Sequence, residues 1–195
     1  TNYGSMVVTD TTFARNRGVY GGGIDDESSL QNWITNSTFI SNTAVQGGGV
    51  YVGGANARLT ITDSRFISNT AANRGGAIRV ANGTLIVENS EFDYNISYGN
   101  EGGGAIHTQV ELVVRGSTFY NNIASHWNSS YGRGGAIRSS SDVFAGLIRI
   151  TIANSTFSQN NANAMGGGIF AYYSTFYITN STFVSNTTNT STSGG

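Results

Sequence analysis

The sequence predicts an all-β fold, a single-stranded right-handed parallel β-helix of about seven coils of roughly 26 residues, and two observations favour it. The tetrad Phe-x-x-Asn recurs with its Phe residues 26, 27, 26, 27, 38 and 26 positions apart. A glycine segment, Gly-Gly-(Gly/Ala)-(Ile/Val), lies between successive tetrads in constant phase. A fixed period of this length is typical of a solenoid, in which each repeat stacks on its neighbours. The tetrads begin at Phe13, Phe39, Phe66, Phe92, Phe119, Phe157 and Phe183 and end at Asn16, Asn42, Asn69, Asn95, Asn122, Asn160 and Asn186.

Each period predicts three short strands. The first alternates apolar and polar residues, as in Leu59-x-Ile61, and ends at Asp, Asn or Gly, which tolerate left-handed backbone. The second contains the Phe of the tetrad, with Ser or Thr two positions before it. The third follows the paired glycines, which allow a sharp corner that a Cβ would obstruct. The glycine segments are residues 21–24, 47–50, 75–78, 103–106, 134–137 and 166–169.

Stacked coils place like residues on like residues, about 4.8 Å apart. We expect the Phe rings to form one column in the core, each contributing about 2 kcal/mol by burial. We expect the tetrad Asn residues to form a ladder of side-chain amide hydrogen bonds. A leucine-rich repeat has a similar period but needs Leu-x-Leu before its Asn, whereas Ser or Thr stands there in this chain.

The sequence predicts one domain, a β-helix over residues 1–186. A tail or linker rich in Ser, Thr, Asn and Gly follows over residues 187–195. The predicted β-helix begins at an apolar segment, residues 6–8, and ends after the last tetrad. Neither end carries an amphipathic α-helix or a polar, Pro-rich cap. Exposed strand edges recruit other chains. We therefore expect the ends to stack on further copies head to tail, or on the rest of a longer solenoid.

Composition limits the partners. The net charge is -1, only 11% of residues are charged, and all ten basic residues are Arg, so the sequence predicts neither nucleic-acid binding nor attraction to an anionic membrane. No apolar run approaches the roughly 20 residues that span a bilayer, so membrane insertion is not predicted. The polar, weakly charged surface favours an extracellular or cell-surface location. Candidate N-glycosylation acceptors, in Asn-x-Ser/Thr sequons, are Asn36, Asn82, Asn95, Asn128, Asn154 and Asn180.

The alternation of the two motifs resembles the passenger domains of the chlamydial polymorphic outer-membrane proteins and related secreted β-helix repeat proteins. Residues 75–78, 103–106 and 134–137 carry the Gly-Gly-Ala-Ile motif in some form, and the seven tetrads carry the other motif. The match spans nearly the whole chain. The resemblance implies a β-helical passenger of a secreted autotransporter adhesin, without known catalytic residues.

One column is the sharpest candidate for a binding site. The residue after each glycine segment is Asp25, Tyr51, Arg79, His107, Arg138 or Phe170. By alternation this residue points out of the core, and Arg79, His107 and Arg138 fall on consecutive coils, with Arg74 and Arg133 flanking them. The functional interpretation is a subsite for an acidic or sulfated sugar, or the base of a lyase. The structural interpretation is a half-exposed face where Arg stems cover apolar surface.

The 38-residue period holds two insertions, around residues 125–131 and 139–145. An irregular coil on a regular scaffold is a common place for binding, and Trp127 and Tyr131 are suited to stacking on a sugar ring or a partner. The alternative is a surface loop without a binding role, in which His126 is solvated.

Catalysis is less well supported than binding. Polysaccharide-cleaving β-helices need clustered carboxylates, and the only run here, residues 25–27, is best interpreted as a solvated turn. No metal or cofactor is predicted, and the calcium-binding nonapeptide is not matched. Ice binding is disfavoured because Thr does not recur in a regular surface column. The leading prediction is a non-enzymatic extracellular stalk, fibre or adhesin subunit; the alternative is a carbohydrate-active β-helix, lyase-like or glycan-binding, that uses the Arg79/His107/Arg138 face.

Overall fold

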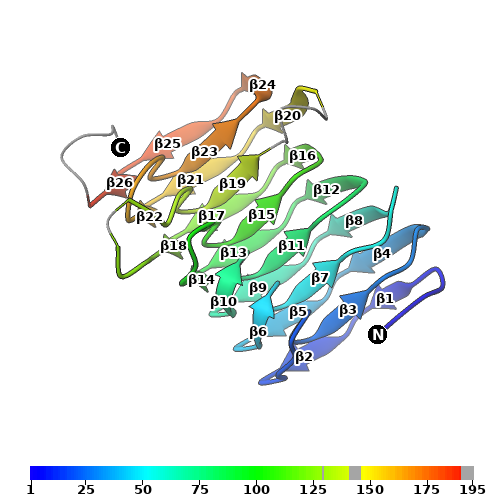
Figure 1. Cartoon of the computed structure of the whole chain (residues 1–195). Coiled ribbons are helices and arrows are strands. Elements are labelled where there is room, and N and C mark those ends of the chain that lie inside the picture. The colour runs from blue at the N-terminus through cyan, green and yellow to red at the C-terminus, as the bar shows by residue number, and fades with distance from the viewer. Residues whose placement is uncertain (129, 141–145, 190–195) are drawn as a thin grey trace.

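The computed structural model describes residues 1–128, 130–140 and 146–189, and this part of the chain contains strands and no helix. The strands form four parallel sheets, named A to D, that wind into a β-solenoid (Figure 1). The chain passes through sheets B, C, D and A in each turn and then rises to the next. The two sheets with most strands have seven each, so the solenoid has about seven turns, as predicted.

Sheets B and C hold the first and second predicted strands of each period. Every strand pairs with its equivalent one coil away, in the register that the period predicts. The sheet B strands are β1 (Val7–Thr9), β4 (Gln31–Thr35), β8 (Arg58–Thr62), β12 (Thr84–Glu88), β16 (Glu111–Arg115), β20 (Ile148–Ala153) and β24 (Ser174–Thr179). The sheet C strands are β2 (Thr12–Ala14), β5 (Thr38–Ile40), β9 (Arg65–Ile67), β13 (Glu91–Asp93), β17 (Thr118–Tyr120), β21 (Thr156–Ser158) and β25 (Thr182–Val184).

Sheet A holds the third predicted strand, and sheet D is an addition to the predicted three strands per coil. Sheet D follows the tetrad directly, with strands of two to five residues. The sheet A strands are β3 (Ile24–Asp26), β7 (Val50–Val52), β11 (Ile78–Val80), β15 (Ile106–Thr108), β19 (Ile137–Ser140) and β23 (Ile169–Tyr172). The sheet D strands are β6 (Thr43–Gln46), β10 (Thr70–Arg74), β14 (Ile96–Ser97), β18 (Ile123–Ala124), β22 (Asn161–Ala162) and β26 (Thr187–Thr188).

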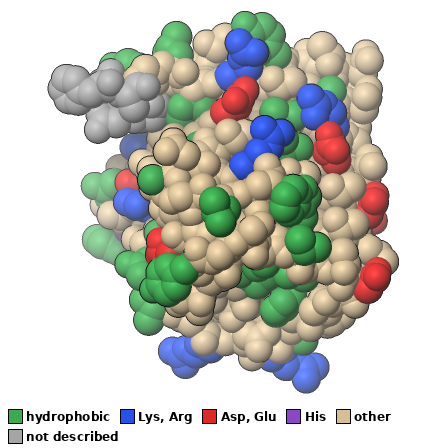
Figure 2. Space-filling view, turned by 90° about the vertical axis from the view of Figure 1, so that its right-hand side faces the viewer, with side chains coloured by type: hydrophobic (Ala, Val, Ile, Leu, Met, Phe, Trp, Pro, Cys, Tyr) green, Lys and Arg blue, Asp and Glu red, His purple; other side chains and the backbone are tan. Residues whose placement is uncertain are grey.

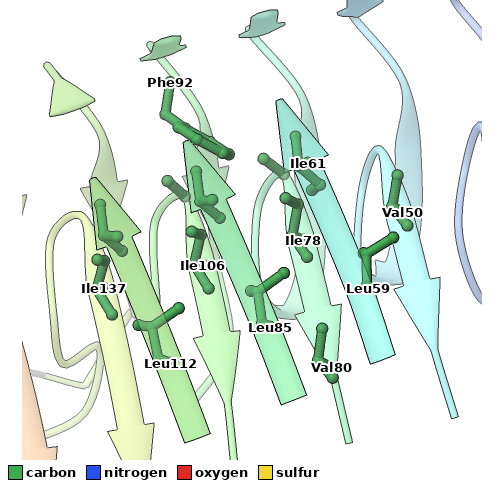
Figure 3. Packing of buried hydrophobic residues seen from close by; sticks show 14 of the residues in the cluster. Val50, Leu59, Ile61, Ile78, Val80, Leu85, Phe92, Ile106, Leu112 and Ile137 are labelled. Atoms are coloured by element: carbon green, nitrogen blue, oxygen red, sulfur yellow. The ribbon is translucent and has the colours of Figure 1, made fainter. Parts of the chain in front are cut away.

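The core is a set of columns of aliphatic residues. Figure 3 shows Leu59, Leu85 and Leu112 of sheet B on successive coils, opposite Ile78 and Ile106 of sheet A. All five side chains have no exposed area. Because each coil buries its apolar side chains against the next one, the apolar area stabilises the coils collectively rather than singly.

The predicted Phe column is confirmed. The rings of all seven tetrads stack face to face, with neighbouring centroids 4.6–4.9 Å apart and ring planes within 6° of parallel. The terminal ring Phe183 is 43% exposed, since no described coil follows it. The rings with no exposed area are those of Phe39, Phe66, Phe92, Phe119 and Phe157.

The predicted Asn ladder is confirmed and runs through all seven coils. Each amide nitrogen donates to the amide oxygen one coil further along, over 2.8–3.1 Å. The long coil does not interrupt the ladder, because Asn122 donates to Asn160 over 2.9 Å although 38 residues separate them. Five members have no exposed area, so they act inside the scaffold rather than at its surface: Asn42, Asn69, Asn95, Asn122 and Asn160.

The ladder is complete in its hydrogen bonds. From Asn42 onward, each amide nitrogen also donates to the carbonyl of the Phe one coil earlier, as Asn95 does to Phe66. Each amide oxygen in turn accepts the backbone N–H of the preceding Asn. An interior Asn such as Asn95 thus makes all four hydrogen bonds that its amide allows.

A second ladder was not predicted. From the second coil onward, the Ser two positions before each Phe accepts the backbone N–H of its equivalent one coil earlier, as Ser90 does from Ser64. Its hydroxyl donates 2.8 Å to the carbonyl two residues before it, as Ser90 does to Glu88. The recurring Ser or Thr at this position was the available signal, because a hydroxyl offers both a donor and acceptor sites.

The corners between sheets are left-handed. The residue three positions before each Phe has φ between 46° and 55°, as its type predicts. The residue two positions after each Phe is also left-handed, although it is Arg15, Tyr94 or Gln159 in some coils. The second of the paired glycines is needed for close approach: a Cβ on Gly76 would lie 2.0 Å from the carbonyl oxygen of Gly104. The paired glycines therefore allow successive coils to approach closely at the corner between sheets D and A.

The long coil keeps the register of its neighbours. Ile106 pairs with Ile137, Leu112 with Ile150 and Phe119 with Phe157 across it. At the C-terminal side, β26 lies within the segment predicted as a tail, and residues 190–195 fall outside the described part, as do residues 141–145 of the second predicted insertion.

Candidate functional site

The outward column of sheet A is formed as predicted. Register pairs align Asp25, Tyr51, Arg79, His107, Arg138 and Phe170 on six consecutive strands. The sheet therefore brings Arg79, His107 and Arg138 side by side.

The predicted half-exposure of this column is wrong at its centre. Arg79 is 2% exposed, Arg138 is 6% exposed and His107 has no exposed area. The segments that enter and leave sheet A fold over its outer face. Gln109, just after β15, binds the guanidinium of Arg79, and Glu101, just before the glycine segment, binds that of Arg138.

The two buried guanidiniums are only partly satisfied. Arg79 donates to the carbonyl of Val80 and to Gln109 Oε1. Arg138 forms an ion pair with Glu101 and also donates to its carbonyl. The Nε atoms of Arg79, Arg138 and the flanking Arg74 and Arg133 are all buried without a hydrogen-bond partner among the described residues. Buried polar atoms are usually paired, so four unpaired Nε atoms in and beside one column are unusual.

His107 lies between the two arginines, and neither ring nitrogen has a hydrogen-bond partner among the described residues. Burial lowers the pKa of His107 well below its usual value, and the charges of Arg79, Arg138 and Arg74 lower it further. The backbone of Gly102 acts in the opposite direction, although no hydrogen bond of ordinary geometry joins it to the ring. The imidazole is therefore neutral at physiological pH.

The arginines also perturb one another. Burial, then the charge of Arg74, lowers the pKa of Arg79 to about 10. Burial lowers the pKa of Arg138 as well; Glu101 opposes this shift, and Arg133 and Arg74 add to it. Both side chains remain charged at neutral pH. The column is thus a partly buried concentration of positive charge.

The column opens to solvent at one end. A cavity of about 550 Å³ lies beside Arg138 and is lined by Arg133, Arg138, Met165, Phe170 and Tyr172. Phe170 is the next member of the column after Arg138. Arg138 was predicted as a site residue but the cavity was not, because Met165 and Tyr172 belong to no recurring motif.

In the predicted aromatic insertion, His126 contacts both of the named aromatic residues. The ring of His126 lies 5.2 Å from those of both Trp127 and Tyr131, and Asn163 donates to the carbonyls of His126 and Asn128. Trp127 is 90% exposed, so the loop presents its largest side chain to solvent. Neither Trp127 nor Tyr131 lines the cavity.

The acidic run at residues 25–27 is not a solvated turn throughout. Asp26 is fully buried and accepts hydrogen bonds from the side-chain amides of Asn2 and Asn32 and from the backbone of Ser28. Burial, then Asp25 and Asp26, raises the pKa of Glu27. Asn32, which interrupts the apolar column of sheet B, is the partner that makes a buried Asp possible. Within the described ranges, no group of three or more His, Cys, Asp or Glu is placed to hold a metal ion.

The sequons differ in accessibility. Asn95 is not an available acceptor, because its amide is buried and fully bonded in the ladder. Asn128 is half-buried, and its sequon includes residue 129, outside the described residues. The exposed acceptors are Asn36, Asn82, Asn154 and Asn180.

The surface carries little charge. Figure 2 shows one face on which uncharged side chains and backbone cover most of the area, with Arg, Asp and Glu spread over it. In the described part of the chain, no helix is long and apolar enough to cross a membrane.

Comparison with known proteins gives one family match. A model of the Chlamydia polymorphic membrane protein repeat matches residues 63–81. These residues run from a left-handed corner at Asp63 through β9, β10 and β11, and contain the Phe66/Asn69 tetrad and the glycine segment 75–78. No curated protein and no solved structure matches the chain significantly. The predicted resemblance to the chlamydial polymorphic membrane proteins is therefore confirmed over residues 63–81, one repeat of this β-solenoid.

Proposed function

We propose that this chain forms a surface-associated, non-enzymatic β-helix, acting as a stalk or adhesin, whose end faces stack head to tail on further copies of itself. The match to a repeat named for membrane proteins supports the surface location. The columns support a scaffold role, because repeated stacking extends the molecule without changing its cross-section. The observation that supports stacking is the exposure of apolar core side chains at the C-terminal end face.

That end face exposes the core. The outermost strands of the four sheets are β23, β24, β25 and β26. Phe176, Ile178 and Phe183 line an apolar hollow of about 550 Å³ there and are each 40–45% exposed. The equivalent residues one coil earlier, Ile150, Ile152 and Phe157, have no exposed area. A coil of the same repeat is the occupant that matches these columns in spacing and residue type.

The stacking is tested by sedimentation velocity and negative-stain electron microscopy over a range of protein concentrations. We expect end-to-end assemblies that lengthen with concentration. Ile178→Asp places a charge on the end face and is expected to abolish them. Tyr94→Asp is the matched control, since Tyr94 is exposed to a similar degree (47% against 45%) but follows β13, the middle strand of sheet C, away from both end faces. Monomers at every concentration, or assembly unaffected by Ile178→Asp, would contradict the proposal.

Catalysis by the sheet A column is not proposed. His107, the candidate base of a lyase, has no exposed area and lies between Arg79 and Arg138, so a polymer cannot contact its ring in this structure. A catalytic base must be within hydrogen-bond reach of the proton that it removes.

A further inference from the structure

The cavity beside Arg138 has the size and lining of a small-molecule site. Its volume of about 550 Å³ is within the usual range for such sites, and it lies over β19 and β23 at the open end of the sheet A column. Phe170, Tyr172 and Met165 supply an apolar wall, and Arg133 and Arg138 supply charged donors. The cavity lies on the side of the solenoid, separate from the hollow at the end face that is proposed for stacking.

The two cations converge on one aromatic ring. The guanidinium carbons of Arg133 and Arg138 lie 5.5 Å and 5.9 Å from the centroid of Phe170, a cation–π distance for both. Tyr172 is 53% exposed and packs edge-on against Tyr173 at a centroid distance of 4.5 Å. The ring of Phe170 thus fixes two guanidiniums that otherwise repel each other.

The site has more positive charge than its own carboxylate balances. Arg74, Arg79, Arg133 and Arg138 act on one another electrostatically, and Glu101 is the carboxylate that acts on both Arg79 and Arg138. The Nε of the buried Arg138 has no partner among the described residues, and the Nε of Arg133 is also unpaired there. Charge-assisted bonds from Arg to carboxylate or sulfate are strong and often bidentate. An anionic ligand group beside these guanidiniums would balance the excess positive charge.

We propose that this cavity binds a sugar ring that carries a carboxylate or sulfate group, with the anion on Arg133 and Arg138 and a face of the ring against Phe170 and Tyr172. The net charge of -1 provides no attraction for a long polyanion such as nucleic acid. Arg79 and His107 lie behind Arg138 and act as its support, not as ligands.

The test is isothermal titration of the whole chain with three probes: a uronate disaccharide, its sulfated counterpart and the carboxyl-reduced neutral disaccharide. We expect the two acidic probes to bind, the neutral one not to bind, and added salt to weaken the binding. Arg133→Gln is expected to reduce the affinity about tenfold, since it removes one charge-assisted interaction. Arg149→Gln is the matched control: the guanidinium of Arg149 lies 5.6 Å from the ring of Tyr177, outside the cavity, and its loss is expected to leave binding unchanged.

Tyr172→Ala is the second variant, because an exposed side chain can be removed without loss of folding, which thermal unfolding followed by circular dichroism checks. This substitution is expected to weaken the binding of the acidic sugars but not the binding of inorganic sulfate. The proposal is overturned if the acidic and neutral probes bind equally, if neither acidic probe binds, or if Arg133→Gln has no effect. Inorganic sulfate or a nucleoside monophosphate that binds more tightly than both acidic sugars would overturn the assignment to a sugar.

Discussion

The inner columns and the outer column of sheet A follow the same period, but they differ in whether their buried polar atoms are hydrogen-bonded. In the Asn ladder, Asn95 makes four hydrogen bonds with full burial. In the outer column, His107 is equally buried and makes none among the described residues. The inner columns repeat one residue type, whereas the outer column changes from Tyr51 to Arg79 to His107. We therefore expect the identical inner columns to contribute most of the stability, and the variable outer column to provide the ligand-binding residues.

The largest effect is expected from the Phe column. Phe92→Ala removes a ring with no exposed area from between Phe66 and Phe119 and leaves a cavity that stacked coils cannot close. We expect a loss of about 3–5 kcal/mol in the free energy of unfolding, measured by guanidinium denaturation followed by circular dichroism. Phe183→Ala at the exposed end of the column is the control and should cost less than half as much. Equal losses would mean that the column does not act through burial.

The Asn ladder is expected to come next. Asn95→Ala leaves the carbonyl of Phe66 and the amide of Asn69 without their partners inside the core. We expect a loss of about 3 kcal/mol in the free energy of unfolding, since each buried unpaired group costs about 1–3 kcal/mol. Asn82→Ala is the control, because Asn82 is exposed and makes one bond, to the carbonyl of Gly53; it should change stability by less than about 0.5 kcal/mol.

The outer column predicts a dependence on pH. The pKa of His107 is lowered in the folded chain, so the unfolded chain binds the proton more readily. Stability is therefore full above the unfolded pKa of about 6.5 and falls as the pH drops below it, by at most about 1.4 kcal/mol per pH unit for one proton.

His107→Phe is expected to remove this contribution, and Phe suits the column because Phe170 occupies it two coils away. The measurement is the free energy of unfolding of both proteins from pH 7 to pH 5. Carboxylates such as Glu101 are present in both, so the difference between the two curves isolates His107. Parallel curves would show that His107 does not titrate on unfolding.

The smallest effect is expected on the outer face of sheet C. Arg65 and Glu91 form an ion pair of 2.8 Å between adjacent coils, with side chains 57% and 49% exposed. Such exposed pairs contribute less than about 1 kcal/mol. Glu91→Gln is expected to shift the unfolding free energy by less than about 0.5 kcal/mol, and less still at high salt. A loss as large as that of Asn95→Ala would contradict the division between inner and outer columns.

The sequence predicts what depends on the period. The Phe and Asn columns follow from it because stacking places Phe66 on Phe92 and Asn69 on Asn95 whatever the loops do. Sheet D escaped prediction because strands of two residues, such as β14, are too short to show alternation. Its one signal was a column of small inward residues, among them Ala44, Ala71 and Ala124. The left-handed corner at Tyr94 could not be predicted, since closure of the coil imposes it on whatever residue stands there.

The candidate site was predicted only in part, for a related reason. Alternation correctly placed Arg79, His107 and Arg138 on the outer side of sheet A. The partners of Arg79 and Arg138 on that side are Gln109 and Glu101, which lie outside the repeated strands. The cavity depends in addition on Met165 and Tyr172, which recur nowhere. Features that occur once in a repeat protein leave no periodic trace.

The Asn ladder also gives the molecule a direction. Every tetrad amide directs its nitrogen toward the following coil and its oxygen toward the preceding one, so the amide dipoles are aligned from Asn16 to Asn186. Chains of hydrogen bonds aligned in this way polarise one another. A coil added beyond Asn186 must offer an acceptor, and a coil added before Asn16 must offer a donor. If two identical ends met, donor would face donor or acceptor would face acceptor. The ladder therefore continues across a head-to-tail contact but not across a contact between two like ends.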